Sequence, residues 1–318
     1  MSPRAPHALA AGVALVWLAS CSDAAARAEA TATPWNDRLE VRESAPFPRW
    51  IPGSPSTLVG SPPERIVAAS VLSAEVLLAI APDRTAAVHR FAANPVYSPI
   101  AEAAQAFGRF TSGDPEQIVS LDGDLVITDA FTHASTQERL EADGVTVVRT
   151  GPARSFEEVR ENLRLIGYAV GEDAGAEELV RHMDRVLETT RRAVEDRASL
   201  RVMNLSPDLY CHGQGSLMDA VIRHVGAQNV AAAQGIGPYG LVSEEQVLEW
   251  APDALILAAE LTAESTERQR LLGHPTLSQL ECVREGRLVF LSPALLGSTS
   301  HRSADATTQL AAALAPWR

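Results

Sequence analysis

Glu116-Gln117-Ile118-Val119, followed by Asp124-Leu125-Val126-Ile127, decides the fold because the same phrase returns later in the chain. The second copy is Glu245-Gln246-Val247-Leu248, followed by Asp253-Ala254-Leu255-Ile256. In each copy Glu-Gln opens a short helix, and an Asp that stands eight residues after the Glu begins a buried strand. A phrase of helix and strand that occurs twice predicts two similar lobes.

Apolar runs and helical patterns alternate on both sides of each copy. The apolar runs typical of buried strands are residues 65–69, 85–88, 145–148, 201–205 and 288–291. The segments with helical spacing are residues 73–80, 136–143, 216–225 and 304–314. Strands that alternate with helices in this way predict parallel sheets covered by helices.

A long helical segment separates the two halves. Ser155 with Glu158 has the spacing of a capping box, and apolar residues behind it recur every three or four positions. A second helix is expected over residues 173–197, with Leu179, Met183 and Leu187 on one face. The predicted fold is therefore α/β, with two Rossmann-like lobes of parallel sheets joined by one long backbone helix. Residues 61–154 form the N-terminal lobe, 155–199 the helical connector and 200–318 the C-terminal lobe, with a ligand cleft between the lobes.

The first residues indicate export rather than folding. Arg4 precedes an apolar stretch over residues 8–18, and Leu18-Ala19-Ser20-Cys21 places small residues before a cleavage point. Residues 1–20 are thus expected to be a signal peptide. Leu-Ala-Ser-Cys resembles the bacterial lipobox, which implies that Cys21 is lipidated and anchors the chain to a membrane, either outer or inner. Residues 21–60, rich in alanine and proline, are expected to form an extended tether.

Composition narrows the range of partners and compartments. The chain has 318 residues, 46% of them hydrophobic, and a net charge of −13. A nucleic-acid partner is excluded because a phosphate backbone requires a basic surface. With Cys21 lipidated, Cys211 and Cys282 remain, and an exported protein leaves both a disulfide and two free thiols open.

Four loops that follow predicted strands each contain a histidine. In parallel α/β lobes, ligands bind beyond the carboxyl ends of the strands. The candidate ligand-binding residues in these loops are His89, Arg90, Phe91, Asp129, His133, Tyr210, His212, Ser216, His301 and Arg302. Three interpretations stay open. The four histidines bind a bare transition-metal ion directly, or they contact a chelated metal together with the arginines and aromatic rings, or they are ordinary loop residues.

A set of short phrases in a fixed order carries a family resemblance over residues 60–316. They include Pro62-Pro63-Glu64-Arg65-Ile66-Val67, both copies of the repeat, Val225-Gly226-Ala227-Gln228-Asn229-Val230-Ala231 and Arg284-Glu285-Gly286-Arg287-Leu288-Val289-Phe290. The chain resembles the helix-backbone class of periplasmic solute-binding proteins, which serve ABC importers of iron-siderophores, haem and cobalamin.

The resemblance implies a monomeric binding protein of the periplasm or cell envelope, not an enzyme and without an intrinsic cofactor. Its transported ligand would contain iron, cobalt or another transition metal, and its partners would be an ABC permease and its ATPase. One glutamate on each lobe would dock onto arginines of the permease. The matching positions are Glu116 and Glu245, the glutamates of the repeat.

Two other classes of function remain open. An exported metal-dependent hydrolase would use Asp129 with His133, but Gly213-Gln214-Gly215-Ser216 lacks the Gly-x-Ser-x-Gly elbow of a nucleophile. A binding protein that stores or senses its ligand without transport is the other. The sequence identifies neither the ligand nor the membrane that carries the lipid anchor.

Overall fold

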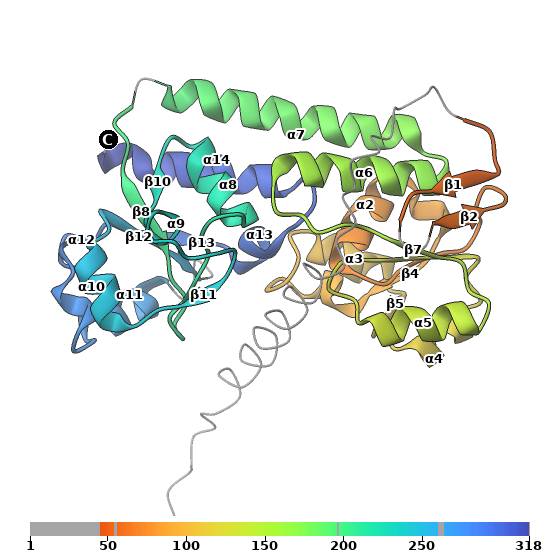
Figure 1. The fold of residues 1–318 in the computed structure, drawn as a ribbon, viewed down its shortest axis with the longest axis horizontal. Helices are drawn as coiled ribbons and strands as arrows, with labels where there is room; N and C mark the ends of the chain where they lie inside the picture. Colours follow the sequence, from red (N-terminus) through yellow and green to blue (C-terminus); the bar gives the residue numbers. More distant parts are fainter. Residues whose placement is uncertain (1–44, 54–55, 196, 260–263, 318) are drawn as a thin grey trace, which may run out of the picture.

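The structure is a computed structural model that describes residues 45–53, 56–195, 197–259 and 264–317. The predicted signal peptide, Cys21 and most of the predicted tether lie outside the described residues. Two α/β lobes lie on the same side of one long helix, α7 (Asp173–Val194), as Figure 1 shows. This is the fold class that the repeat predicts.

The N-terminal lobe is built on a parallel sheet with the strand order β5-β4-β3-β6-β7. Its strands are β3 (Ile66–Ala68), β4 (Thr85–His89), β5 (Phe110–Thr111), β6 (Leu125–Thr128) and β7 (Val147–Arg149). Its helices are α2 (Val71–Ile80), α3 (Ala101–Phe107), α4 (Pro115–Ser120) and α5 (Ala134–Ala142), with 3-10 turns at Pro82–Arg84 and Arg90–Ala93.

The C-terminal lobe repeats this plan with a smaller parallel sheet in the order β10-β8-β12-β13. Its strands are β8 (Arg201–Asn204), β10 (Gln228–Asn229), β12 (Ala254–Ala258) and β13 (Leu288–Leu291), and a hairpin pairs β9 (Tyr210–Cys211) with β11 (Gly240–Leu241). Its helices are α8 (Leu217–His224), α9 (Val230–Ala233), α10 (Glu244–Trp250), α11 (Glu264–Leu272), α12 (Glu281–Arg284) and α13 (Pro293–Gly297), with a 3-10 turn at Leu277–Gln279.

Both copies of the repeated phrase form the same pair of elements. Glu116 and Glu245 are the second residues of α4 and α10, and the following strands β6 and β12 each begin one residue after the Asp of the phrase. Each of these strands lies beside the first parallel strand of its lobe, β3 or β8. The sequence repeat is therefore a structural repeat.

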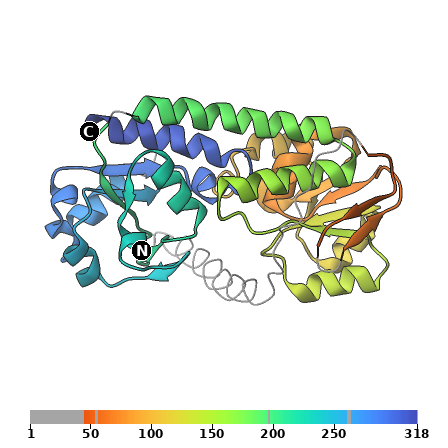
Figure 2. The same cartoon turned by 45° about the horizontal axis from the view of Figure 1, so that its top comes forward.

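Three helices connect the lobes: α6 (Phe156–Val170), α7 and α14 (Ser303–Leu314). Helix α14 runs alongside α7 in both views (Figures 1 and 2), and Thr190 Oγ1 of α7 lies 3.1 Å from Thr308 Oγ1 of α14. Along α7, Met183 and Leu187 belong to the N-terminal core, whereas Val194 belongs to the C-terminal core. The helix thus shares apolar contacts with both lobes. A 3-10 turn at Ala315–Trp317 ends the described chain.

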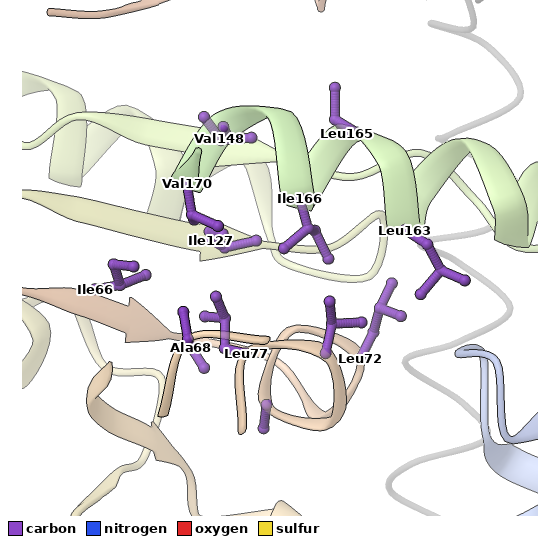
Figure 3. Close-up of a cluster of buried hydrophobic side chains, with 14 of the residues drawn as sticks. Ile66, Ala68, Leu72, Leu77, Ile127, Val148, Leu163, Leu165, Ile166 and Val170 are labelled. Carbon is purple, nitrogen blue, oxygen red and sulfur yellow. The ribbon is translucent and has the colours of Figure 1, made fainter. Parts of the chain in front are cut away.

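The N-terminal core lies between α6, α2 and the sheet. Figure 3 shows Ile166 and Val170 of α6 above Ile127 of β6, with Ile66 of β3 and Leu77 of α2 below. All five side chains are fully buried. Burying large aliphatic side chains removes apolar surface from water, and this is the main stabilising contribution to such a lobe.

The end of the predicted tether pairs with itself and packs on the N-terminal lobe, which differs from the free tether expected from the sequence. Strands β1 (Arg49–Ile51) and β2 (Thr57–Val59) pair as an antiparallel hairpin. The Arg49 guanidinium is buried, donating to the Asp173 carboxylate at 2.8 Å and to the Tyr168 carbonyl at 2.7 Å. These partners lie more than a hundred residues away in the sequence, so the local proline content does not indicate them.

One of the two expected capping boxes forms. Gln246 completes the capping box at Ser243, whereas Glu158 accepts a hydrogen bond from the Arg154 N–H instead of reaching back to Ser155.

Cys211 and Cys282 are buried free thiols, so the disulfide alternative is wrong. Burial raises the pKa of both thiols to about 11. Among the described residues, no helix has the length and apolar character of a membrane span.

Candidate functional site

The carboxyl ends of the parallel strands define where a ligand site is expected in each lobe. In the N-terminal sheet the chain crosses from β3 to β4 on one side and returns to β6 on the other. In the C-terminal sheet β8 has the same position, between β10 and β12. Ligands of open α/β sheets bind where the strand order reverses in this way. The two reversal points are therefore the β3/β6 edge and the β8/β12 edge.

A buried polar cluster joins the two lobes. Helix α2 begins at the carboxyl end of β3, with Ser70 as its N-cap, and carries Glu75. The loop after α13, which follows the carboxyl end of β13, carries Ser298 and Ser300. Ser298 Oγ donates to Glu75 Oε2 at 2.9 Å, and Ser300 Oγ donates to the same oxygen. Glu75 and these serines stand more than two hundred residues apart, so their bonds tie helix α2 of the N-terminal lobe to a loop of the C-terminal lobe.

The Glu75 carboxyl is almost fully enclosed, with 2% of the residue exposed. Burial raises its pKa, while the hydroxyls of Ser300, Ser298 and Ser98 and the charge of Arg302 act in the opposite direction. Ser98 Oγ donates to Glu75 Oε1 at 3.2 Å. A carboxyl group surrounded by three hydroxyl donors and apolar helices is stable there because its oxygens are hydrogen-bonded. The sequence analysis missed Glu75, because nothing near it in the chain indicates its partners.

His89 stands at the carboxyl end of β4, as the sequence predicts, but both of its ring nitrogens contact the backbone. Nδ1 accepts from the Phe91 N–H at 3.3 Å, and Nε2 lies 3.2 Å from the Ser112 carbonyl. Burial lowers the pKa of His89, and the neighbouring Arg90 lowers it further. The ring is thus held neutral, with Nε2–H as the donor. It presents its edge to Phe91, with centroids 4.9 Å apart, and Phe91 in turn contacts Tyr97.

Asp129 follows β6 and shapes its own loop. Its Oδ1 accepts hydrogen bonds from the Phe131 N–H at 3.1 Å and from the Thr132 N–H and hydroxyl at 3.0 Å each. Burial raises its pKa. Arg149 binds the Asp129 carbonyl through Nε at 3.1 Å. His133 is the exposed N-cap residue of α5, without a side-chain capping bond. Asp129 Oδ1 thus bonds its own turn, and we assign Asp129 a structural role rather than a role in acid–base catalysis with His133.

In the C-terminal lobe, the half-buried His212 follows β9. Its Nδ1 lies 2.6 Å from Asn204 Oδ1 at the end of β8. The ring meets that of Tyr239, with centroids 5.1 Å apart, and Tyr239 is 42% exposed. Burial lowers the pKa of His212 to about 4, so the ring is neutral at pH 7. An exposed tyrosine backed by a neutral imidazole forms an aromatic surface at this edge.

Tyr210 and Ser216 lie in the same loop as His212 but differ in role. Tyr210 is half-buried on β9, and its backbone pairs with Leu241 of β11. Ser216 is the buried N-cap of α8: its hydroxyl accepts from the Asp219 N–H at 3.0 Å and donates to the Gly213 carbonyl at 2.8 Å. The Ser216 hydroxyl is therefore occupied by the backbone, and we assign it a structural role.

His301 and Arg302 follow Ser300 in the loop that bonds Glu75. Among the described residues, buried side-chain atoms without a hydrogen-bond partner are His301 Nδ1, Arg302 Nε and Thr128 Oγ1. His301 is 6% exposed, and burial lowers its pKa to about 4. Its ring is near that of His182 on α7, with centroids 6.4 Å apart. His301 thus lies against the backbone helix rather than beside the other candidate histidines.

The four candidate histidines lie on different elements: His89 ends β4, His133 is the N-cap of α5, His212 follows β9, and His301 lies near α7. Within the described part of the chain, no group of three or more His, Cys, Asp or Glu side chains is placed to hold a metal ion. The four-histidine site is therefore not formed in this structure. Sequence reasoning missed the contacts of Glu75, Ser98, Tyr97, Asn204 and Tyr239, because no local pattern indicates which side chains meet across a loop.

A shallow depression of about 570 Å³ lies elsewhere, along the exposed face of α7. It is lined by Arg181, Asp184, Arg185, Glu188, Thr189 and Arg192. Its charged side chains form ion pairs, such as Arg192 with Glu188 at 2.6 Å and Asp184 with Arg160 at 2.6 Å. We interpret this surface as a solvated helix face, because exposed ion pairs of this kind are common on long helices.

The predicted docking glutamates are both exposed. Glu116 and Glu245 lie on α4 and α10, one on each lobe, on the side of the molecule away from α7 (Figure 1). The pKa of Glu245 is lowered by hydrogen bonds to its own backbone N–H and to Ser243, so this carboxylate is negative at neutral pH.

Known proteins share this architecture. A Bacillus subtilis protein, the "uncharacterized ABC transporter substrate-binding lipoprotein YvrC", is 24% identical over 210 residues, and the match spans 63% of this chain and 65% of that protein. The apo periplasmic haem-binding protein RhuT from Roseiflexus sp. RS-1 has a TM-score of 0.68 at 24% identity, over 79% of this chain and 97% of RhuT. The periplasmic vitamin B12-binding protein BtuF of Vibrio cholerae has a TM-score of 0.65 at 20% identity, over 80% of this chain and 98% of BtuF. Residues 66–295 match the family described as periplasmic binding protein. That match covers more than half of the chain, so this protein belongs to the periplasmic binding protein family.

Proposed function

We propose that this chain is the substrate-binding lipoprotein of an ABC importer, which captures a metal chelate between its lobes and delivers it to a membrane permease. The observation that carries the proposal is the bonding of Glu75 to Ser298 and Ser300, since it joins the two α/β lobes between which we infer that the ligand binds. The names of the Bacillus relative and of the haem-binding and vitamin B12-binding structures support this assignment.

A chelate fits the side chains better than a bare ion does. The nitrogens of His89 contact the backbone, and Nδ1 of His212 contacts Asn204, so neither ring offers its full donor set. Phe91 and Tyr239 instead provide aromatic surface beside these histidines. Arg90 adds an exposed cation, and its guanidinium lies 5.3 Å from the Phe91 ring centre. Aromatic rings and guanidinium groups suit a large organic ligand with acidic groups.

The proposed contacts to the chelate are therefore Arg90, Phe91, Tyr210, His212 and Arg302, with Tyr97 and Tyr239 added from the structure. To test them, the purified chain is titrated with haem, cobalamin and a ferric hydroxamate, with tryptophan fluorescence as the readout, and native mass spectrometry gives the stoichiometry. We expect one of these chelates to bind in a 1:1 complex, and Zn²⁺ and Fe³⁺ alone not to bind.

Two variants and one control distinguish side chains that bind the chelate from side chains that do not. Arg90→Ala and Tyr239→Ala should weaken binding of that chelate, whereas His133→Ala, on the exposed end of α5, serves as the control. Failure of all three chelates to bind, or tight binding of an ion alone, contradicts the proposal.

The docking role of Glu116 and Glu245 is a separate part of the proposal. Their two carboxylates, one on each lobe, suit a permease that presents two equivalent cationic sites. The double variant Glu116→Gln/Glu245→Gln should keep chelate binding and lose stimulation of the permease-bound ATPase. The control is Glu138→Gln/Glu249→Gln, which removes two other exposed carboxylates, one from each lobe. Loss of chelate binding in the docking variant would refute the role.

The lipid anchor on Cys21 lies outside the described residues and rests on the sequence motif. Cys21→Ala should move the expressed protein from the membrane fraction to the soluble fraction and abolish incorporation of radiolabelled palmitate. Membrane association that survives this change would show that the anchor is not Cys21.

A further inference from the structure

Helix α4, which carries Glu116, is fastened at its carboxyl end by an arginine from the neighbouring strand. Arg65 Nη2 donates to the Leu121 carbonyl at 2.8 Å, and Arg65 Nε donates to the Asp122 carbonyl at 3.0 Å. Asp122, the residue after the C-cap Leu121, is left-handed with a φ of 51°. The last carbonyls of a helix have no partner within the helix, and a guanidinium satisfies two of them at once.

The same arginine is itself held in place by the Asp of the repeated phrase. Asp124 Oδ1 accepts from the Arg65 backbone N–H at 3.0 Å, and Asp124 Oδ2 accepts from the Glu64 N–H at 2.6 Å. The Asp124 N–H in turn donates to the Arg65 carbonyl at 3.0 Å. The carboxylate thus bonds the backbone of Arg65 and leaves its guanidinium to the helix.

Helix α10, which carries Glu245, is held in the same way by Arg201. Its Nη2 donates to the Trp250 carbonyl at 2.6 Å, and Nη1 donates to the Ala251 carbonyl at 2.9 Å. Ala251 has a φ of 43°, which matches the left-handed Asp122. Asp253 Oδ2 accepts from the Arg201 N–H at 2.7 Å, and the Asp253 N–H donates to the Arg201 carbonyl at 2.7 Å.

The two arrangements agree residue for residue. Counted from the glutamate, the carbonyls that the arginine binds are those of the fifth and sixth residues, and the Asp is the eighth residue in both lobes. In both lobes the arginine precedes or begins the first parallel strand, β3 or β8, which has hydrogen-bonded neighbours on both sides. Each glutamate-bearing helix is therefore tied to the most central strands of its lobe.

We propose that Arg65 and Arg201 are positioning residues, which hold Glu116 and Glu245 at a fixed place and direction for a cationic partner surface. The inference rests on the docking role proposed above and extends it to two residues that do not touch the partner. Helices of six and seven residues are too short to be rigid alone. A helix tied to the sheet enters a complex already ordered, so less conformational freedom is lost on binding.

The experiment compares three variants of the full chain in two measurements without ligand. Binding is measured to the permease–ATPase complex of the source organism in lipid nanodiscs, and hydrogen exchange is measured at the amides of α4 and α10. Arg65→Gln/Arg201→Gln removes both guanidinium groups. Arg65→Lys/Arg201→Lys keeps the charge with a single donor group. Arg84→Gln is the control, since Arg84 Nη1 likewise bonds two carbonyls, those of Pro63 and Val170, the latter at the end of α6.

We expect Arg65→Gln/Arg201→Gln to speed exchange in α4 and α10 and to raise the Kd for the nanodiscs by about tenfold. The lysine variant should recover part of that affinity, and Arg84→Gln should change neither measurement. An unchanged Kd despite faster exchange, or unchanged exchange in both helices, overturns the positioning role. Glu116→Gln/Glu245→Gln is run beside them: if it weakens binding while the arginine variants do not, only positioning fails. If it leaves binding intact, the docking role fails as well.

Discussion

The two lobes share one scaffold and differ in the loops that it carries. The Arg–Asp contacts behind α4 and α10 match in residue type, spacing and left-handed helix end. The histidines at the ligand edges do not match: His89 bonds backbone groups through both nitrogens, whereas His212 bonds the Asn204 side chain and meets an exposed tyrosine. The difference agrees with the proposed function, in which the matched helices face the permease and the unmatched loops face the ligand.

The largest effect on stability is expected at equivalent buried positions of the two lobes. Ile127 of β6 and Ile256 of β12 each stand three residues after the Asp of the repeated phrase, and both are fully buried. Ile127→Ala and Ile256→Ala should each lower the free energy of unfolding by about 2–5 kcal/mol, because each leaves a cavity. Urea unfolding followed by circular dichroism measures the loss. A loss well under 1 kcal/mol in only one lobe would show that the two sheets are not equivalent.

The pH dependence of stability should distinguish the two loop histidines. The pKa of His212 is lowered to about 4 in the folded chain, whereas an unfolded histidine takes up its proton near pH 6.5. The unfolded state therefore binds more protons between these values, and stability falls as pH drops from about 6.5 toward 4. The contribution of His212 is roughly 1–3 kcal/mol, fully present above pH 6.5.

Two substitutions measure that contribution lobe by lobe. His212→Gln should flatten the dependence of the melting temperature on pH between 4 and 6.5. His89→Gln should flatten this pH dependence less, because the pKa of His89 is lowered by a smaller amount than that of His212. Equal flattening by both variants would contradict the difference between the pKa shifts of the two histidines.

Glu75, where the lobes meet, should respond to pH in the opposite sense. Its folded pKa is raised above the usual 4.5, so the folded chain keeps a proton that the unfolded chain has released. The stabilising contribution of the neutral carboxyl is present below pH 4.5 and is lost as pH rises through the raised value. Glu75→Gln should cost about 1 kcal/mol at low pH and less at pH 8, measured by thermal unfolding at both. A cost that does not change with pH would contradict the raised pKa.

The smallest effect is expected on the outer face of α7, which belongs to neither ligand edge. Arg191 and Arg192 hold the pKa of Glu188 at about 2, yet this ion-pair group is exposed to solvent. Glu188→Gln should leave the melting temperature and chelate binding unchanged, since exposed ion pairs are screened by water and salt. A clear drop in melting temperature would mean that α7 depends on its charges, not on its buried stripe.

Local patterns in the sequence were enough to predict most strands and helices. The apolar runs at residues 85–88, 124–127 and 254–258 became β4, β6 and β12, and the repeated Glu-Gln phrase placed α4 and α10 correctly. These elements depend on near neighbours: on the period of apolar residues and on caps one turn away. The backbone helix was predicted for the same reason, from one apolar face repeated over its whole length.

The junction and the loop chemistry were decided only by tertiary structure. The buried Arg49 needs Tyr168 and Asp173, and the buried Glu75 needs Ser298 and Ser300. In each case a polar side chain is stable out of water because residues distant in the sequence form hydrogen bonds with it. Likewise a histidine after a strand is visible in the sequence, but which of its nitrogens remain for a ligand depends on the backbone and side chains that fold around it.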